Sequence, residues 1–335
     1  MSWKNERLER NKAFFEGNFE AQGIPVKCVK SVESPFGDTY FFDLDNVANY
    51  SEKRLKDLVK KLSLYTHREM TYKETKESHF AICVEDENTN YVSLTQCINE
   101  EQGRNFVIGK SDGNENVILD FEKIPHLLIA GTTGSGKSVL LHNLLVNFLC
   151  YFGRKDRLRK AELLIIDPKG SELNEYRNVR CATYVDDTYQ AIQCLKIMET
   201  EMDRRYKSLD IRQDHDIFVV IDELADLMLT SKYEVETSIV RLAQKGRACG
   251  IHLIVATQTP RVAVISGIIK ANIENRIALK TASKTDSICI LDHAGCEQLK
   301  GSGDSIVRLN GVEMRCQIAY PENEIISKMI DRNQY

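Results

Sequence analysis

The sequence predicts an α/β fold with a mostly parallel β-sheet, preceded by a small α+β domain. From His126 onward, apolar runs of strand length alternate with longer helical segments. Continuous Ile/Val/Leu strands between helices are typical of a parallel sheet that is covered on both faces. These runs are "HLLIAG", "ELLIIDP", "IFVVIDE", "IHLIVAT" and "NRIALK". The 335 residues, 42% of them hydrophobic, are enough for two packed cores.

Three segments are expected along the chain. Residues 1–23 predict a helix with a loose apolar face, packed on its own domain or on a neighbouring subunit. Residues 24–104 form the small α+β domain, with strand candidates "TYFFDL", "HFAICVE" and "NYVSL". Its helix is "SEKRLKDLVKKLSLY", with Ser51 as N-cap. Residues 105–335 form the second domain, which opens with two strands around the turn at 111–113.

Composition favours a cytoplasmic protein. Ten cysteines are scattered without a C-x-x-C pair, which is typical of reduced thiols. The charged N-terminus has no apolar signal-peptide core. The longest apolar stretch, Val139 to Phe152, is interrupted by polar residues and is too short to span a bilayer. We therefore expect no membrane-spanning segment.

The charge is unevenly distributed. The chain carries a net charge of −4, yet residues 231–281 contain eight Lys/Arg against three Asp/Glu. A local basic surface on an acidic protein is compatible with a groove for a polyanion. Solvated helix faces explain the same pattern equally well.

A glycine-rich segment after the first apolar strand matches G-x-x-x-x-G-K-[ST] and precedes a helical run. Glycines let the backbone wrap phosphates, so that main-chain N–H groups and the helix N-terminus face the negative charge. Lys137 is expected to reach the β- and γ-phosphates, and the Ser138 hydroxyl to ligate Mg²⁺. The predicted nucleotide-binding residues are Gly131, Thr132, Thr133, Gly134, Ser135, Gly136, Lys137, Ser138 and Val139.

Two acids follow directly on another apolar strand. Acids at the carboxyl end of a buried parallel strand face the ligand crevice. Asp222 is therefore predicted to hold Mg²⁺, and Glu223 to be the general base that polarises the attacking water. A small-molecule kinase does not need the second acid, so the pair favours ATP hydrolysis.

Other candidates are weaker when taken alone. The segment "IHLIVATQTP" is an apolar strand that ends in the polar residues Thr257 and Gln258, and a polar side chain there could sense hydrolysis at the γ-phosphate. Arg241 and Arg247 precede that strand; each is either a surface salt-bridge residue or an arginine supplied to a neighbouring subunit's site. "LLIIDPKGSEL" is expected to project Asp167 and Lys169 at the same sheet edge as the phosphate site.

Taken together, these elements resemble the motor domain of the FtsK/SpoIIIE family of DNA translocases. The matching segments run from Pro125 to Asp304, in family order. They are "PHLLIAGTTGSGKS", "IIDPKGSEL", "VIDELADLM", "RLAQKGRACGIHLIVATQTP", "SGIIKANIENRIALKTASKTDS" and "ILDHAGCEQLKGSGD". Residues 24–100 also resemble the small domain that precedes this motor.

The resemblance implies a RecA-like P-loop NTPase that assembles as a ring, expected to be a hexamer, around double-stranded DNA. It carries the phosphate, Mg²⁺ and acid roles to the residues named above, and the sensor role to Gln258. Arg247 is the first choice for the arginine acting in trans, and Arg241 the second. The implied DNA contacts are Lys232, Arg261 and Lys270.

Departures from the family leave alternatives open. We expect neither the membrane helices nor the winged-helix module of larger family members, and the arginine usual after the sensor Gln is displaced to Arg261. A short, soluble relative suits the transfer or maintenance of a mobile genetic element that moves its own DNA, and chromosome segregation is the other role that the resemblance implies. One alternative is a conjugative coupling ATPase that passes a relaxase-bound single strand. A protein-secretion ATPase and a non-catalytic DNA-binding adaptor are the others.

Overall fold

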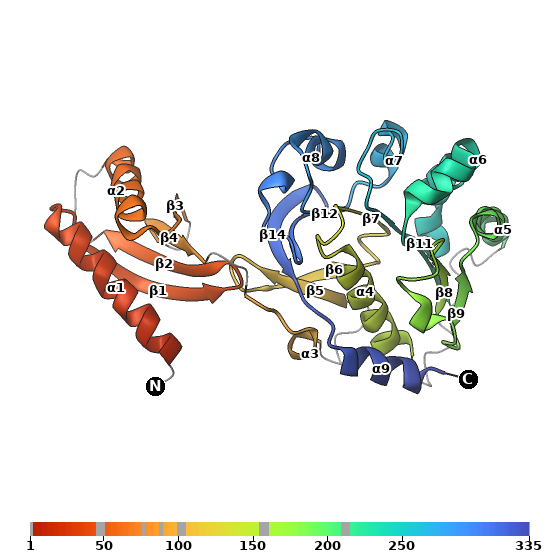
Figure 1. Ribbon diagram of the computed structural model, residues 1–335, viewed down its shortest axis with the longest axis horizontal. Helices are drawn as coiled ribbons and strands as arrows, with labels where there is room; N and C mark the ends of the chain where they lie inside the picture. The colour runs from red at the N-terminus through yellow and green to blue at the C-terminus, as the bar shows by residue number, and fades with distance from the viewer. Residues whose placement is uncertain are drawn as a thin grey trace. The chain divides into compact units, whose positions relative to one another are not determined.

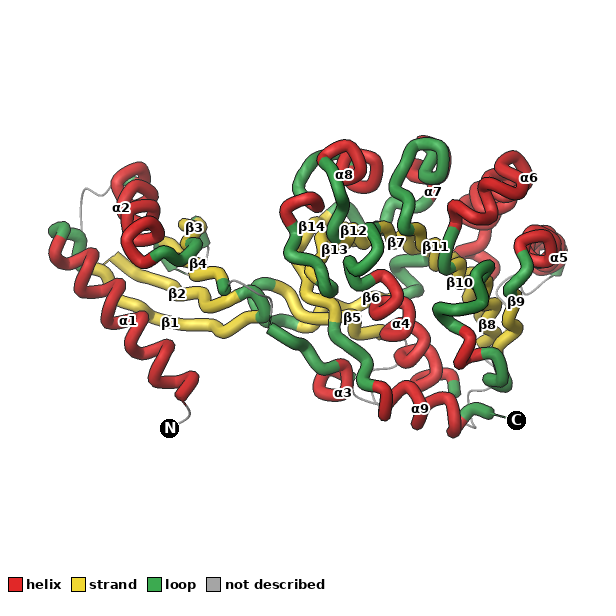
Figure 2. Tube along the Cα trace, in the orientation of Figure 1, coloured by secondary structure: helices red, strands yellow, loops and turns green. Residues whose placement is uncertain are grey.

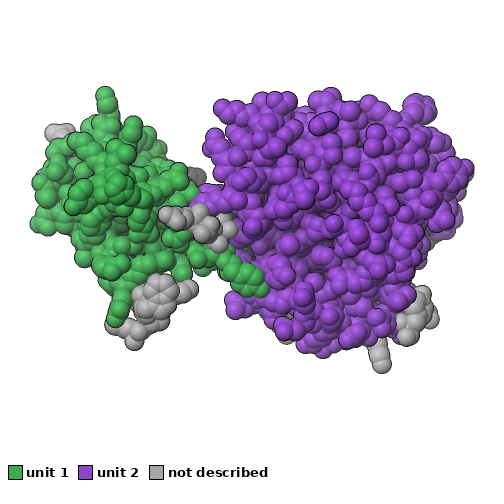
Figure 3. Space-filling model, viewed as in Figure 1, with its two compact units in different colours: residues 1–91, 110–115 green, residues 92–109, 116–335 purple. Residues whose placement is uncertain are grey.

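The structure, a computed structural model, describes residues 3–44, 51–75, 78–86, 90–98, 105–153, 161–208 and 215–334. The chain divides into two compact units (Figure 3). The smaller unit comprises residues 1–91 and 110–115, and the larger comprises residues 92–109 and 116–335. Among the described residues, no helix is both long and apolar enough to cross a membrane.

The smaller unit packs two helices on a four-stranded antiparallel sheet. Its strands lie in the order β1-β2-β4-β3. Phe15 and Phe19 of the first helix contact the same core as Phe42 and Phe80 of the sheet. The helix predicted for residues 1–23 therefore packs on its own unit. The elements are α1 (Trp3–Ala21), β1 (Val26–Ser34), β2 (Gly37–Leu44), α2 (Glu52–Thr66), β3 (Met70–Lys73) and β4 (Phe80–Glu85).

One strand prediction is wrong. In "NYVSL" only Ser93 makes an isolated bridge, to Tyr320, and Leu94 already begins the short helix α3 (Leu94–Cys97). The apolar residues of this segment bury against the larger unit's core without a partner strand to extend the pairing. Ser51 does hold the N-cap position of α2, but its side chain makes no capping hydrogen bond.

The larger unit is built on a ten-stranded sheet in the order β6-β5-β14-β13-β12-β7-β11-β10-β8-β9. All neighbours from β12 to β9 are parallel, whereas β12-β13-β14 are antiparallel. The predicted, mostly parallel sheet is thus confirmed. The strands are β5 (Asn105–Ser111), β6 (Asn116–Asp120), β7 (His126–Ala130), β8 (Ala161–Ile166), β9 (Ala182–Val185), β10 (Asp216–Ile221), β11 (Ile251–Thr257), β12 (Arg276–Leu279), β13 (Asp304–Leu309) and β14 (Val312–Ile318).

Helices cover both faces of this sheet, as buried parallel strands require (Figures 1 and 2). On one face, α4 (Lys137–Phe152) and α9 (Asn323–Arg332) share a core with the strands. On the other lie α5 (Thr188–Lys207), α6 (Leu224–Lys245), α7 (Gly267–Asn272) and α8 (Lys284–Leu291). Three 3₁₀ turns complete the described elements: η1 (Asn174–Tyr176), η2 (Gly246–Cys249) and η3 (Cys296–Gln298).

Helix α6 is interrupted at Ser231, whose φ of −155° and ψ of 85° are not helical. The segment after this residue is tied to α5 by ion pairs from Lys196 to Glu234 and from Arg241 to Glu199. Beside the interruption, the side chains of Leu229 and Tyr233 are 85% and 81% exposed. The helix therefore consists of two segments, and only the second is bound to α5 by these pairs.

Candidate nucleotide-binding and hydrolysis site

The loop between β7 and α4 has the backbone of a phosphate-binding loop. Gly136, at the N-cap of α4, has a φ of 108°, which disfavours any residue with a side chain. A Cβ atom there would also lie 2.6 Å from the main-chain nitrogen of Gly303. A Cβ at Gly131 would lie 2.6 Å from the Cβ of Leu279. The motif glycines thus allow neighbouring segments to approach closely.

Hydrogen bonds fix this loop in place. The N–H and hydroxyl of Thr132 both donate to the Lys280 carbonyl oxygen, over 2.9 and 3.1 Å. The Gly303 N–H donates to the Ser135 carbonyl oxygen over 2.8 Å. The Ser135 hydroxyl is buried and has no hydrogen-bond partner among the described residues. A buried polar atom without a partner inside a rigid loop fits a site that bonds a ligand.

Lys137 and Asp222 meet beneath this loop. The Lys137 ammonium donates to the Asp222 carbonyl oxygen over 2.7 Å and also to its carboxylate. Both side chains are buried. Burial raises the pKa of Asp222, and the adjacent Lys137 charge opposes that rise. The cation predicted for phosphate and the acid predicted for Mg²⁺ therefore lie side by side.

Glu223 occupies the N-cap of α6 and is held through both carboxylate oxygens. Its Oε1 accepts from the Thr257 hydroxyl over 2.5 Å and from the Ala225 N–H over 3.2 Å. Its Oε2 accepts from the Gln258 N–H over 2.9 Å. The residue is 1% exposed. The end of β11 thus positions the carboxylate that follows β10.

The sensor candidate also contacts the phosphate loop. The Thr133 hydroxyl donates to the Gln258 side-chain oxygen over 2.8 Å. The carboxyl ends of β7, β10 and β11 therefore bring the loop, both acids and Gln258 together in one place. Ser138 and Val139 lie in the first turn of α4 and are half-buried.

Neither arginine candidate reaches this group of residues within one chain. Arg241 pairs with Glu199 over 2.5 Å and with Asp203 over 3.1 Å, both on α5. Arg247 lies in η2, before the amino end of β11, and thus near the sheet edge opposite the phosphate loop. Its Nη2 donates to the Glu122 carbonyl oxygen over 3.3 Å.

The three DNA-contact candidates differ in their surroundings. Lys232 follows the interruption in α6, and Arg261 lies in the loop after β11; both are exposed. Lys270 of α7 is only 20% exposed and pairs with Asp292 over 2.7 Å. Asp292 also accepts from Arg276 over 2.8 Å. Lys270 therefore belongs to an ion-pair cluster within the chain.

Asp167 follows the carboxyl end of β8, at the sheet edge where it was expected. It is fully buried and accepts hydrogen bonds from the N–H groups of Gly170, Glu172 and Leu173, and from the Tyr184 hydroxyl. It organises the loop after β8, and its carboxylate raises the pKa of Asp222. Thr257, the polar residue that ends β11, is not among the predicted site residues, although its hydroxyl bonds Glu223.

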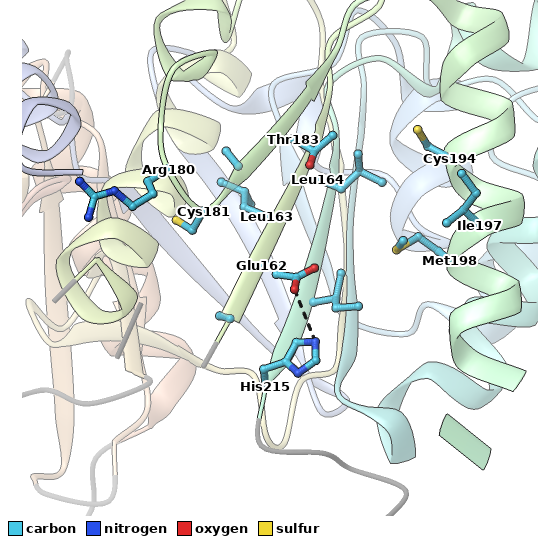
Figure 4. Close-up of a pocket in the computed structure, with 13 residues that line it drawn as sticks. Glu162, Leu163, Leu164, Arg180, Cys181, Thr183, Cys194, Ile197, Met198 and His215 are labelled. Atoms are coloured by element: carbon cyan, nitrogen blue, oxygen red, sulfur yellow. Dashed lines mark ion pairs between the residues drawn. The ribbon is translucent and has the colours of Figure 1, made fainter. Parts of the chain in front are cut away.

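Two cavities are notable among the described residues. The larger, of about 570 Å³, lies among β8, β9 and α5, where His215 faces Glu162 at 3.7 Å (Figure 4). None of the residues that line it belongs to the phosphate loop. The smaller, of about 440 Å³, is lined partly by Ser138 and Val139. Volume alone therefore does not locate the nucleotide.

A strand, a glycine-rich loop and a helix, with a buried lysine beside an acid at the end of a neighbouring parallel strand, define a P-loop nucleotide-binding protein. Residues 99–215 and 210–262 match the FtsK/SpoIIIE family. The chain belongs to this family.

The relatives include the DNA translocase FtsK of Caldanaerobacter subterraneus subsp. tengcongensis, 35% identical over 356 residues, covering 98% of this chain and 49% of that protein. The DNA translocase SpoIIIE of Bacillus subtilis is 39% identical over 252 residues, covering 67% of this chain and 32% of that protein. The chain thus spans about a third to a half of the length of these relatives.

Solved structures support the fold. The pCW3 conjugation coupling protein TcpA, solved with ATPgS, superposes with a TM-score of 0.65 at 23% identity, covering 96% of this chain and 99% of that one. The cytoplasmic domain of the type VII secretion ATPase EccC from Thermomonospora curvata gives 0.60 at 20% identity, covering 71% and 32%. At these identities the likeness concerns the fold alone.

Proposed function

We propose that this chain is an ATPase that moves double-stranded DNA as a ring-shaped homo-oligomer, expected to be a hexamer. The observation that carries the proposal is the gathering of Lys137, Asp222, Glu223 and Gln258 at the carboxyl ends of three adjacent strands. The chain belongs to a family whose relatives are named DNA translocases, and this membership indicates that DNA is the polymer that it moves. The cytoplasmic location expected from the sequence belongs to the same proposal.

The residues present fit ATP with Mg²⁺. The Ser138 hydroxyl and the Asp222 carboxylate would hold the ion, which supplies positive charge to the phosphate oxygens when bound. Lys137 exchanges its bond to Asp222 for the β- and γ-phosphates. The loop N–H groups and the Ser135 hydroxyl orient the phosphates, and the Glu223 carboxylate takes a proton from the attacking water. Gln258 bonds both the loop and Glu223, so it is placed to respond to the γ-phosphate.

An arginine from a neighbouring subunit would complete the site. Arg247 is our first choice because it is exposed and its described hydrogen bond goes to a single carbonyl oxygen. Arg241 is second because it would first have to leave Glu199 and Asp203.

DNA would contact the exposed surface formed by the interruption in α6 and the loop after β11. Lys232 and Arg261 supply positive charge there for DNA phosphates. Lys270 would have to exchange its bond to Asp292 for a phosphate. The loop with Arg261 begins at Gln258, so DNA contact and hydrolysis are linked through one strand end.

A second candidate is a conjugative coupling ATPase that passes a relaxase-bound single strand. The fold match to the conjugation coupling protein TcpA, which covers 96% of this chain, supports it. Possible partners would then include a relaxase or other transfer proteins of a mobile element. A protein-secretion role has weaker support, namely the partial fold match to EccC.

The decisive experiment measures ATP hydrolysis with linear duplex DNA, with single-stranded DNA and without DNA, followed by triplex displacement on the duplex. Stimulation by duplex and ATP-dependent displacement are expected. Greater stimulation by single strands would favour the coupling role, and no stimulation by either would reject both.

Glu223→Gln should bind ATP without turnover, while Glu236→Gln on the same helix should behave as wild type. Retained hydrolysis in Glu223→Gln would remove that residue from the base role.

The DNA surface has a separate test. Charge reversal of Lys232 and Arg261 should weaken duplex binding and reduce its dependence on salt by about two phosphate contacts. Adding the charge reversal of Lys270 tests whether that residue leaves Asp292 for a DNA phosphate, because the salt dependence of duplex binding should then fall further. An unchanged salt slope in all variants would place the DNA on a different surface.

A further inference from the structure

A cleft opens beside the first turn of α4, next to the phosphate loop. Its volume is about 440 Å³, within the range of small-ligand sites. Its walls come from α4, from η1, from α9 and from the segment joining β14 to α9. Ser138 and Val139, which end the predicted phosphate-binding segment, form part of its lining. The cleft therefore lies directly beside any ligand that the phosphate loop binds.

The lining of the cleft is suited to a planar, uncharged group. Tyr320 lines it and is 40% exposed, and apolar surface comes from Pro321 and Ile326. His142 and Glu175, which lie 3.1 Å apart, contribute hydrogen-bonding groups. Among the described residues that line the cleft, there is no lysine or arginine. An additional phosphate group would find no cationic side chain here.

The main chain of Tyr320 is fixed on both sides. Its N–H donates to the Val92 carbonyl oxygen over 2.8 Å, and its carbonyl oxygen accepts from the Leu94 N–H over 2.9 Å. Elsewhere in the lining, His142 lies 3.1 Å from the Tyr176 hydroxyl. These bonds hold both parts of the lining in position before any ligand binds. The main-chain bonds also persist when the Tyr320 side chain is replaced.

We propose that this cleft binds the base and ribose of the nucleotide whose phosphates lie on residues 131–138, with the Tyr320 ring as the stacking surface. The inference rests on the proposed function, because it needs a nucleotide on that loop. A base stacked on an aromatic ring contributes ~1–3 kcal/mol. Loss of the ring should therefore weaken ATP binding by about 5- to 150-fold.

The test compares calorimetric affinities for ATP and for tripolyphosphate, which carries the charge but no base. Tyr320→Ala should raise the Kd for ATP by the factor above and leave the Kd for tripolyphosphate unchanged. Tyr320→Phe should stay within about twofold of wild type, because it keeps the ring. Tyr320→Leu, which keeps apolar bulk without a ring, replaces the alanine variant if that variant unfolds. Ile197→Ala, in the larger cavity, is the matched control and should change neither affinity.

The outcomes separate the two proposals. Unchanged ATP affinity in Tyr320→Ala, while Lys137→Ala loses both ligands, would overturn the assignment of the cleft and leave the phosphate site standing. Equal weakening of ATP and tripolyphosphate in Tyr320→Ala would also overturn it, because the effect would then come through the loop. If the wild type binds neither ligand, the proposed function itself fails, and the cleft assignment fails with it.

Discussion

The hydroxyl of Thr257 offers a direct test of how the candidate general base is held. Thr257→Val keeps the branched shape of the side chain but removes the donor that bonds Glu223 over 2.5 Å. It also removes the acceptor for the Thr259 N–H, over 3.0 Å. Thr257 and Glu223 are 0% and 1% exposed, so water does not readily replace these bonds.

The magnitude follows from the two bonds. A hydrogen bond to a charged group contributes about 1.5–3 kcal/mol and a neutral one about 1 kcal/mol. Since Glu223 keeps the Gln258 and Ala225 N–H donors, we expect Thr257→Val to lower the free energy of unfolding by about 2–4 kcal/mol. Thr257→Ser keeps the hydroxyl and loses one methyl group, which costs about 1 kcal/mol. The valine variant should therefore be the less stable by about 1–3 kcal/mol.

Urea unfolding followed by far-UV circular dichroism measures this difference, with the transition of the larger unit compared between variants. If the valine and serine variants unfold at the same urea concentration, the hydroxyl contributes nothing to holding Glu223. The reasoning about its position would then be wrong.

Three further predictions concern stability. Burial, followed by the nearby His252 charge, lowers the pKa of His126 from 6.5 to about 3. The stability that depends on a neutral His126 ring is fully present above pH 6.5. It is lost as the pH falls toward 3, by up to about 1.4 kcal/mol of unfolding free energy per pH unit. His126→Asn should therefore make the free energy of unfolding fall less steeply with acid, and an unchanged slope would contradict this. Gly136→Ala should destabilise the protein by more than Gly134→Ala, where an added Cβ meets no atom within 4 Å; equal thermal shifts would argue against the tight approach. Arg241→Ala should lower the free energy of unfolding by about 1–3 kcal/mol, because it leaves the Glu199 carboxylate, 12% exposed, without its guanidinium partner; a loss below about 0.5 kcal/mol would mean that the pair is only a surface contact.

The inner strands of the parallel half, β7, β8, β10, β11 and β12, were predictable because they are buried on both faces, whereas the partly exposed edge strand β9 was not predicted. The inner strands consist mostly of Ile, Val, Leu and Phe. "NYVSL" was misread because a short apolar run does not reveal whether a partner strand exists. Val92 and Leu94 bury against the core, yet the pairing is confined to Ser93, because α3 begins at Leu94.

The residues of the candidate site could be predicted where the site depends on a local sequence motif or on the residues that directly follow one strand. Glycines and a lysine at fixed spacing, and acids directly after β10, need no knowledge of distant contacts. The partner of Glu223 could not be inferred in this way, because Thr257 becomes its neighbour only when β11 pairs with β10. The same limit applies to Lys270, whose bond to Asp292 joins residues 22 positions apart.

The interruption at Ser231 has a mechanical consequence. Two rigid rods joined at a single non-helical residue form a hinge, and here the far rod is fastened to α5 while the near rod begins at Glu223. A small tilt that starts at the carboxylate would be absorbed at this hinge instead of moving the whole helix. Residues 224–230 would then shift with Glu223, while Lys232 and the rest of the second segment stay fastened to α5.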